Sequence, residues 1–356
     1  MQTTHLMLVT FLTADLATLA PGTLNEFEKS PYNALAVPVI SSYFTGSIPT
    51  LQNIQPKLAE IKARTSKDIW PWVFINRMVG MDPGQKNVNA HTSYFQGIKG
   101  LDLEDRVGAQ SDFLRAWRVA LEVARELHAP GIVCDLELYN NPAAEDVFEL
   151  ARLTGKTAPE AIQLLQGLGT RLADITDEEL PGGTVWFFFT GLHRPDFQVV
   201  DDRPYYRATS YVVLGMLMRI KQAGLRVSVI SGGEIGLGYC HASIKQLQSD
   251  FEARLRAFRP HLEKYAGILF LGGTITLWRD ASDKSDWLAQ GSCAASPARN
   301  IEELKPYLRD LLRHYTYVWV YAAVAAGGYN PFDPLTAPRF NAVIQQAIKE
   351  AGTRDP

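Results

Sequence analysis

Short apolar runs of β type alternate with amphipathic segments along the whole chain. Eight such runs predict strands, at residues 6–12, 34–40, 69–75, 131–137, 184–190, 225–231, 266–271 and 316–322. Between them, apolar residues recur at the three-to-four-residue spacing of a helix. This spacing predicts helices at residues 51–64, 112–128, 159–175, 206–223, 243–264, 300–314 and 338–351.

Eight strands alternating with helices predict an α/β fold, a single (β/α)8 TIM barrel that takes residues 1–356 as one domain. The mostly apolar strands agree with a sheet covered on both faces. A doubly wound open sheet is disfavoured because no glycine-rich phosphate fingerprint follows the first strand. That first strand is the weakest of the eight, since residues 6–12 could also begin a helix. A long loop at about residues 78–110 interrupts the pattern, and loops of this length in compact domains are usually functional.

Composition narrows the class of protein. The chain is 46% hydrophobic and 21% charged, as in an ordinary globular protein, and its net charge of −3 indicates neither a nucleic acid nor an anionic membrane as partner. No run is long enough to span a bilayer. Three widely spaced cysteines indicate no disulfide framework or metal site. The N-terminal run lacks the features of a signal peptide and predicts a strand, so the sequence assigns no compartment; secreted or periplasmic location would require a leader removed beforehand.

The run GIVCDLELYN, residues 131–140, carries the strongest chemical signal. Side chains two apart share a strand face, so Asp135 and Glu137 are expected to point the same way, opposite an apolar wall. In a barrel that wall packs on helices, and the acids lie at the mouth, within about 8 Å of each other. Two nearby carboxylates in a desolvated place have pKa values pushed apart, which suits acid–base chemistry. Acids that merely meet solvent or cap the next helix are the structural alternative.

Other candidate side chains follow the ends of the remaining strands. Glu234 comes after a strand and a Gly-Gly pair that permits a tight turn, and it is the candidate second carboxylate. Period-two spacing puts Trp319 and Tyr321 on one face of the last strand, where they predict an aromatic platform. Aromatic faces and polar groups around a carboxylate pair are typical of a sugar site. The further candidate substrate-binding residues are Tyr43, Asn76, Arg77, Tyr139, Asn140 and His193.

The segment GIVCDLELY resembles the strand end of glycoside hydrolase family 18, whose pattern is D-x-x-D-x-D-x-E. The match places Glu137 on the family's general acid and Asp135 on the acid that orients the substrate's N-acetyl group. Val133 and Pro130 stand where the family has two further acids, which argues against that substrate-assisted route and a chitin-like substrate. The chain also resembles, over most of its length, a group of uncharacterised bacterial barrel proteins classed as glycoside hydrolases. The matching segments are residues 27–37, 97–105, 131–140 and 315–321.

These patterns and resemblances predict a glycoside hydrolase-like enzyme that uses carboxylate acid–base catalysis on a carbohydrate, with no cofactor and no metal. Glu137 is the expected general acid, Asp135 its partner, and Glu234 the second carboxylate of a two-carboxylate route. One alternative is a metal-dependent sugar isomerase or epimerase, with Glu137, His193, Glu234 and His241 as ligands. Another is a barrel that binds glycans without catalysis. The sugar, the linkage, the anomeric outcome and the oligomeric state are not encoded in any recognisable pattern.

Overall fold

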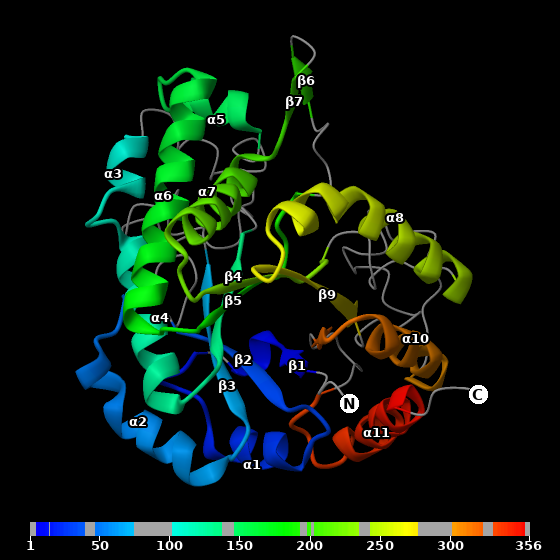
Figure 1. Ribbon diagram of the computed structural model, residues 1–356. Coiled ribbons are helices and arrows are strands. Elements are labelled where there is room, and N and C mark those ends of the chain that lie inside the picture. Colours follow the sequence, from blue (N-terminus) through cyan, green and yellow to red (C-terminus); the bar gives the residue numbers. More distant parts are fainter. Residues whose placement is uncertain are drawn as a thin grey trace.

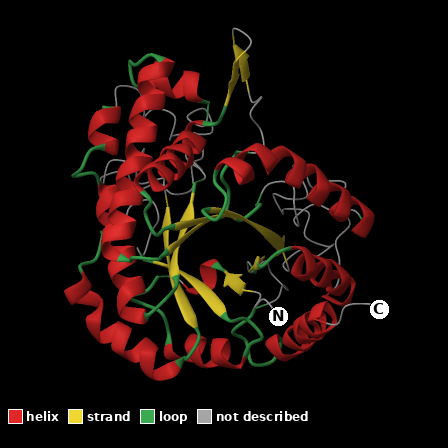
Figure 2. Cartoon of the chain, viewed as in Figure 1, coloured by secondary structure: helices red, strands yellow, loops and turns green. Residues whose placement is uncertain are grey.

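The computed structural model describes residues 5–13, 15–39, 47–74, 102–136, 146–192, 198–200, 203–234, 243–276, 301–322 and 330–352. Eight parallel strands close into a barrel in the order β1-β10-β9-β8-β5-β4-β3-β2, with helices packed around the outside (Figures 1 and 2). The barrel strands are β1 (His5–Val9), β2 (Ala34–Pro38), β3 (Asp68–Phe74), β4 (Gly131–Asp135), β5 (Thr184–Phe187), β8 (Ser228–Ser231), β9 (Leu269–Thr276) and β10 (Tyr317–Tyr321). The protein is therefore a (β/α)8 barrel, as predicted.

All seven predicted helices are present within about two to four residues of their expected ends. They are α2 (Leu51–Arg64), α4 (Asp112–Leu127), α6 (Ala158–Glu179), α7 (Ala208–Ala223), α8 (Ile244–Lys264), α10 (Ile301–His314) and α11 (Ala337–Gly352). Local signals set several ends. Thr157 and Glu160 form a capping box at the start of α6, and Gly224 adopts a left-handed φ of 64° at the end of α7.

The sequence pattern missed several short elements. They are α1 (Pro21–Lys29), α3 (Leu103–Val107), α5 (Val147–Leu153), the 3-10 turn η1 (Phe11–Thr13) and the antiparallel hairpin of β6 (Gln198–Val200) and β7 (Arg203–Tyr205). Helix α3 lies inside the segment predicted as a long loop at about residues 78–110, of which residues 78–101 fall outside the described ranges. These elements are too short to show a clear period. The hairpin stands apart from the barrel, at the top of Figure 1.

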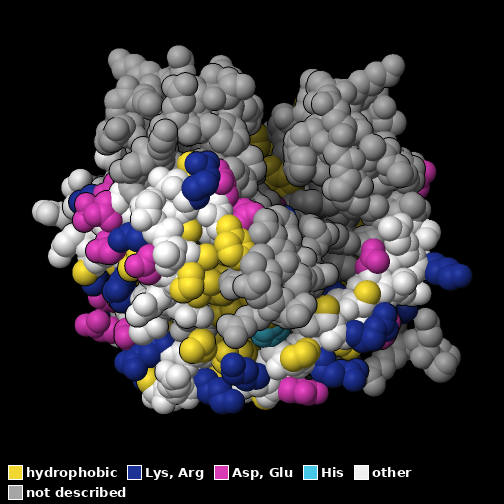
Figure 3. Space-filling model, turned by 90° about the horizontal axis from the view of Figure 1, so that it is seen from above, with side chains coloured by type: hydrophobic (Ala, Val, Ile, Leu, Met, Phe, Trp, Pro, Cys, Tyr) yellow, Lys and Arg dark blue, Asp and Glu magenta, His cyan; other side chains and the backbone are white. Residues whose placement is uncertain are grey.

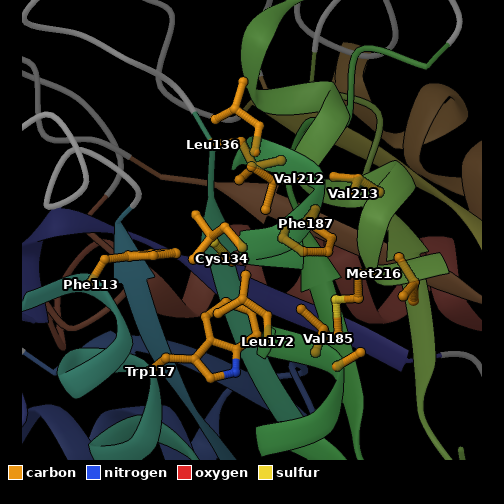
Figure 4. Packing of buried hydrophobic residues seen from close by; sticks show 14 of the residues in the cluster. Phe113, Trp117, Cys134, Leu136, Leu172, Val185, Phe187, Val212, Val213 and Met216 are labelled. Carbon is orange, nitrogen blue, oxygen red and sulfur yellow. The ribbon is translucent and has the colours of Figure 1, made fainter. Parts of the chain in front are cut away.

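The outer faces of the strands pack against helices, as the apolar runs predict. From β4 and β5, Cys134, Val185 and Phe187 belong to the same buried cluster as Val212 and Met216 of α7 (Figure 4). All five side chains are fully buried. Burial raises the pKa of the Cys134 thiol well above its usual value, and the nearby Asp135 carboxylate raises it further. Cys134 is therefore a buried core residue with little thiolate character.

Aromatic rings fill the barrel interior in two layers. In the lower layer, Trp70 of β3 meets Trp186 of β5 edge to face, with ring centroids 5.8 Å apart. In the upper layer, the Phe188 ring meets Trp72 edge to face at 5.2 Å and stacks on Trp319 at 4.4 Å. These five rings are at most 2% exposed. The sequence left open whether Trp70 and Trp72 point inward or toward helices; both point inward.

The surface carries mixed charge. On the face seen in Figure 3, basic and acidic side chains are interspersed instead of gathered into a patch of one sign. No helix in the described part of the chain combines the length and apolarity needed to cross a bilayer.

The Asp68 carboxyl at the amino-terminal end of the barrel predicts how the stability of the fold depends on pH. Burial raises the pKa of Asp68, at the start of β3, and the nearby His5 partly opposes this rise. A carboxyl whose pKa is raised on folding stabilises the fold most below its unfolded pKa, and this contribution is lost as the pH rises through the folded pKa. Asp68→Asn should therefore be more stable than the wild type at pH 7, and the difference should shrink as the pH falls toward 4.

Urea unfolding of both proteins at pH 7, 5 and 4 measures this difference. Asp174→Asn, which removes an equal charge from an exposed ion pair with Arg219, controls for net charge. An Asp68→Asn protein that is less stable than the wild type at pH 7 would contradict the prediction.

Candidate functional site

The carboxyl-terminal ends of the strands gather the candidate residues at one end of the barrel. Parallel strands all deliver their ends to the same edge, which is where active sites of this fold lie. Within the described residues, Asp135 ends β4, Glu234 follows β8 by three positions, and Trp319 and Tyr321 lie near the end of β10. Four of the predicted site residues therefore share this edge.

Asp135 is a buried acid on the inner face of β4. Its neighbours alternate as predicted: Cys134 and Leu136 belong to the helix-facing core, whereas Val133 belongs to the barrel interior. Asp135 shares the face of Val133 by the two-residue period of a strand, and it is 2% exposed. It lies beside Phe74 in the register between β3 and β4. A carboxyl group in this position faces the rim of the upper aromatic layer.

The turn that carries Glu234 is defined by backbone hydrogen bonds from β5. The Gly232 N–H donates to the Phe187 carbonyl at 2.7 Å, and the Glu234 N–H donates to the Phe188 carbonyl at 3.0 Å. Gly233 adopts a φ of 79°, a left-handed conformation that side chains with a Cβ rarely take. The Gly-Gly pair thus makes the tight turn that the sequence predicts and places Glu234 directly above β8.

Trp319 joins the aromatic interior to this turn. Its indole Nε1–H donates to the Gly232 carbonyl at 3.0 Å, and its ring stacks on Phe188. The ring is 1% exposed, so it packs as the floor beneath the strand ends. Tyr321 is half-buried and meets Trp319 edge to face at 6.4 Å. Whether a sugar contacts these rings stays a prediction.

The remaining predicted site residues lie outside the described ranges. They are Tyr43, Asn76, Arg77, Glu137, Tyr139, Asn140 and His193, together with His241 of the metal alternative. Their assignments, and the expected distance between Asp135 and Glu137, stay predictions. In the described part of the chain, no three His, Cys, Asp or Glu residues lie close enough together to hold a metal ion.

Two polar features at the carboxyl-terminal ends of the strands were not among the predicted site residues. The Thr190 and Ser231 hydroxyls, both buried, form a 2.9 Å hydrogen bond between the ends of β5 and β8. Arg254 of α8 is 7% exposed and donates to backbone carbonyls at the same place. A signal for Arg254 was present: it follows Leu247 by seven positions and precedes Phe258 by four, so a cation occupies the apolar stripe of α8.

Comparison with known proteins identifies the fold. No family model matches the sequence, and no curated protein matches it. Among solved structures, the chain is similar to an endo-beta-mannanase/endo-beta-glucanase from Prevotella bryantii, with a TM-score of 0.50 and 9% identity over 97% of this chain and 48% of the other.

Two further structures show comparable likeness. A GH113 beta-1,4-mannanase has a TM-score of 0.49 and 11% identity over 99% of this chain and 100% of its own. A GH5-4 broad specificity endoglucanase from an uncultured bacterium has a TM-score of 0.49 and 9% identity over 92% and 84% of the two chains. The solved structures that resemble this chain are mostly glycoside hydrolases. At 9% identity, the likeness to the Prevotella bryantii enzyme shows the fold alone.

The buried position of Trp319 predicts that its substitution lowers the free energy of unfolding. Trp319→Ala should lower the free energy of unfolding by about 3–5 kcal/mol, because it leaves a large cavity in the upper aromatic layer. Trp319→Phe keeps a ring against Phe188 but leaves the Gly232 carbonyl without its donor, which should cost about 1–3 kcal/mol. Chemical denaturation measures both values.

Trp186→Ala serves as the matched control, because Trp186 is equally buried and packs against Trp70 and Tyr317 in the lower layer. If Trp319 also contacts sugar, calorimetric titration should show weaker glycan binding in the Trp319 variants than in Trp186→Ala. A loss of stability below about 1 kcal/mol in Trp319→Ala would contradict the packing role.

Proposed function

We propose that this protein is a glycoside hydrolase-like enzyme that cleaves glycosidic bonds by carboxylate acid–base catalysis. The observation that carries the proposal is the inward, 2% exposed Asp135 at the carboxyl-terminal edge, two strands away from the turn that carries Glu234. Acidic residues on strand ends at this edge are the usual source of catalytic groups in (β/α)8 barrels. The fold shared with glycoside hydrolases is consistent with this function but does not assign it.

In the proposed mechanism, Glu137 is the general acid that protonates the leaving-group oxygen. Asp135, two residues earlier, is the partner acid, and like-charge repulsion between two neighbouring carboxylates disfavours ionising both at once. Glu234 acts on the opposite side of the sugar, either as the nucleophile or as the base that activates water. The role of Glu137 comes from its match to the family 18 pattern, and that of Glu234 from its place after a strand and a Gly-Gly pair.

The spacing of strands bears on the stereochemistry. β4 and β8 are separated by β5, and neighbouring strands lie about 4.8 Å apart, so their backbones are about 10 Å apart. Side chains that converge from this distance can bring the carboxyl groups to about 5 Å, which gives retention, or leave them about 6.5–9.5 Å apart, which gives inversion. Analysis of the product anomer by NMR distinguishes the two routes.

The aromatic rings and polar groups at the strand ends support a carbohydrate as substrate. Tyr321 is half-buried at the end of β10, and Trp319 lies directly beneath it. A pyranose ring has apolar faces that pack on aromatic side chains, while its hydroxyls bond to amides, phenols and carboxylates. A screen over chromogenic glycosides and polysaccharides identifies the sugar and tests the proposal directly.

The catalytic prediction separates the two carboxylates. Glu137→Gln keeps the shape of the side chain but removes its proton, so turnover of an unactivated glycoside should fall by roughly 100- to 10,000-fold. Aryl glycosides with activated leaving groups need little protonation and should be affected much less. Glu234→Gln should impair both kinds of substrate, because attack at the anomeric carbon is required whatever the leaving group.

Near-normal turnover of an unactivated glycoside by Glu137→Gln would end the assignment. Activity that a chelator abolishes and a divalent ion restores would instead support the metal-dependent isomerase or epimerase. Glycan binding without hydrolysis of any substrate in the panel would support the non-catalytic barrel.

A further inference from the structure

Arg254 is a buried cation on the barrel side of α8. It is 7% exposed, and its guanidinium carbon lies 5.3 Å from the ring centre of Phe258 and 5.7 Å from that of Tyr315. No acidic side chain within the described ranges forms an ion pair with it. A buried charge without a carboxylate partner costs free energy unless hydrogen bonds compensate. The hydrogen bonds of the guanidinium therefore indicate how the buried charge of Arg254 is compensated.

Those contacts are backbone carbonyls of two neighbouring barrel strands. Nη2 donates to the Ser231 carbonyl at 2.7 Å and lies 3.3 Å from the Ser231 hydroxyl oxygen. Nη1 donates to the Gly272 carbonyl of β9 and lies 3.4 Å from the Tyr315 hydroxyl. The planar fork of the guanidinium thus ties the last residue of β8 to β9.

The same guanidinium packs against the turn that carries Glu234. A Cβ at position 233 would crowd the Arg254 guanidinium, and the φ of 79° at this position also favours glycine. From the barrel interior, Trp319 binds the Gly232 carbonyl, and the Phe188 carbonyl accepts the Glu234 N–H. The turn is consequently held from the inside by β5 and β10 and from the outside by Arg254.

We propose that Arg254 is a positioning residue that holds the Ser231–Glu234 turn so that the Glu234 carboxylate faces the substrate. This role rests on the proposed function, in which Glu234 is the second carboxylate. Arg254 touches neither substrate nor reacting atoms; it acts by restricting the backbone one and three residues before Glu234. A misplacement of about 1 Å at a catalytic group can cost about 100-fold in rate.

The test compares Arg254→Met and Arg254→Lys with a matched control. Methionine fills much of the same space without donors, whereas lysine keeps the charge and can bond one carbonyl. Arg219→Met on α7 removes an arginine that is partly exposed and paired with Asp174 at 2.7 Å. Two readouts are measured on the full chain: amide hydrogen exchange across residues 231–234, and kcat and KM on the glycoside found by the screen.

We expect Arg254→Met to speed exchange of the Glu234 amide at least about tenfold, while amides of β3 and β4 exchange as in the wild type. We expect kcat to fall by about 100-fold with KM changed less than about threefold, because binding residues stay in place. Arg254→Lys should recover part of both losses, and Arg219→Met should show neither. If Arg254→Met does not fold, the lysine variant gives the same comparison with a smaller effect.

Three results would overturn the proposal. Unchanged exchange and unchanged kcat in Arg254→Met would show that the turn needs no guanidinium. Faster exchange throughout the barrel would show that Arg254 only stabilises the fold. Faster exchange at the turn with normal kcat would show that the position of Glu234 does not matter. If the wild-type chain hydrolyses no glycoside, the proposed function fails, while the exchange experiment still decides whether Arg254 holds the turn.

Discussion

The filling of the barrel interior by aromatic rings is the constraint on which the rest of the structure depends. Eight strands close into a barrel only if side chains fill the space that they enclose. Here Trp70 and Trp186 fill the lower layer, and Trp72, Phe188 and Trp319 fill the upper one. Small residues such as Ala34 and Ala36 on β2 leave room for these rings. Because each ring sits on an inward position, it fixes which residues of its strand face the interior.

The alternation of inward and outward side chains along each strand also determines the geometry of the candidate site. Val133 lies in the barrel interior and Cys134 packs among the helices. The two-residue period of the strand therefore directs Asp135 to the inner face at the end of β4. Trp319 also fixes the position of the turn after β8, since its Nε1–H donates a hydrogen bond to the Gly232 carbonyl. The upper aromatic layer is thus both the top of the hydrophobic core and the floor of the edge where the carboxylates lie. The same side chains therefore pack the core and support the proposed site.

The likeness to solved structures shows the fold of this protein but not its chemistry. The Prevotella bryantii enzyme matches 97% of this chain in structure at only 9% sequence identity. Such agreement reflects requirements that any (β/α)8 barrel must meet: inward filling, outward apolar faces and parallel closure. Chemistry depends instead on the few residues that each barrel places at its strand ends. For this protein, Asp135, Glu137 and Glu234 therefore carry the functional hypothesis more than the fold does.

The sequence by itself determined the strands, the long helices, the barrel and the face of Asp135. These features depend on the spacing of apolar residues and on composition over a few neighbouring positions, and both can be read from the local sequence. Only the tertiary structure decided that Trp70 and Trp72 fill the barrel, because a fully apolar strand looks the same from either face. Arg254 shows the same limit. Its place on the apolar stripe of α8 was visible in the sequence, but its bonds to Ser231 and Gly272 exist only because folding brings distant segments together.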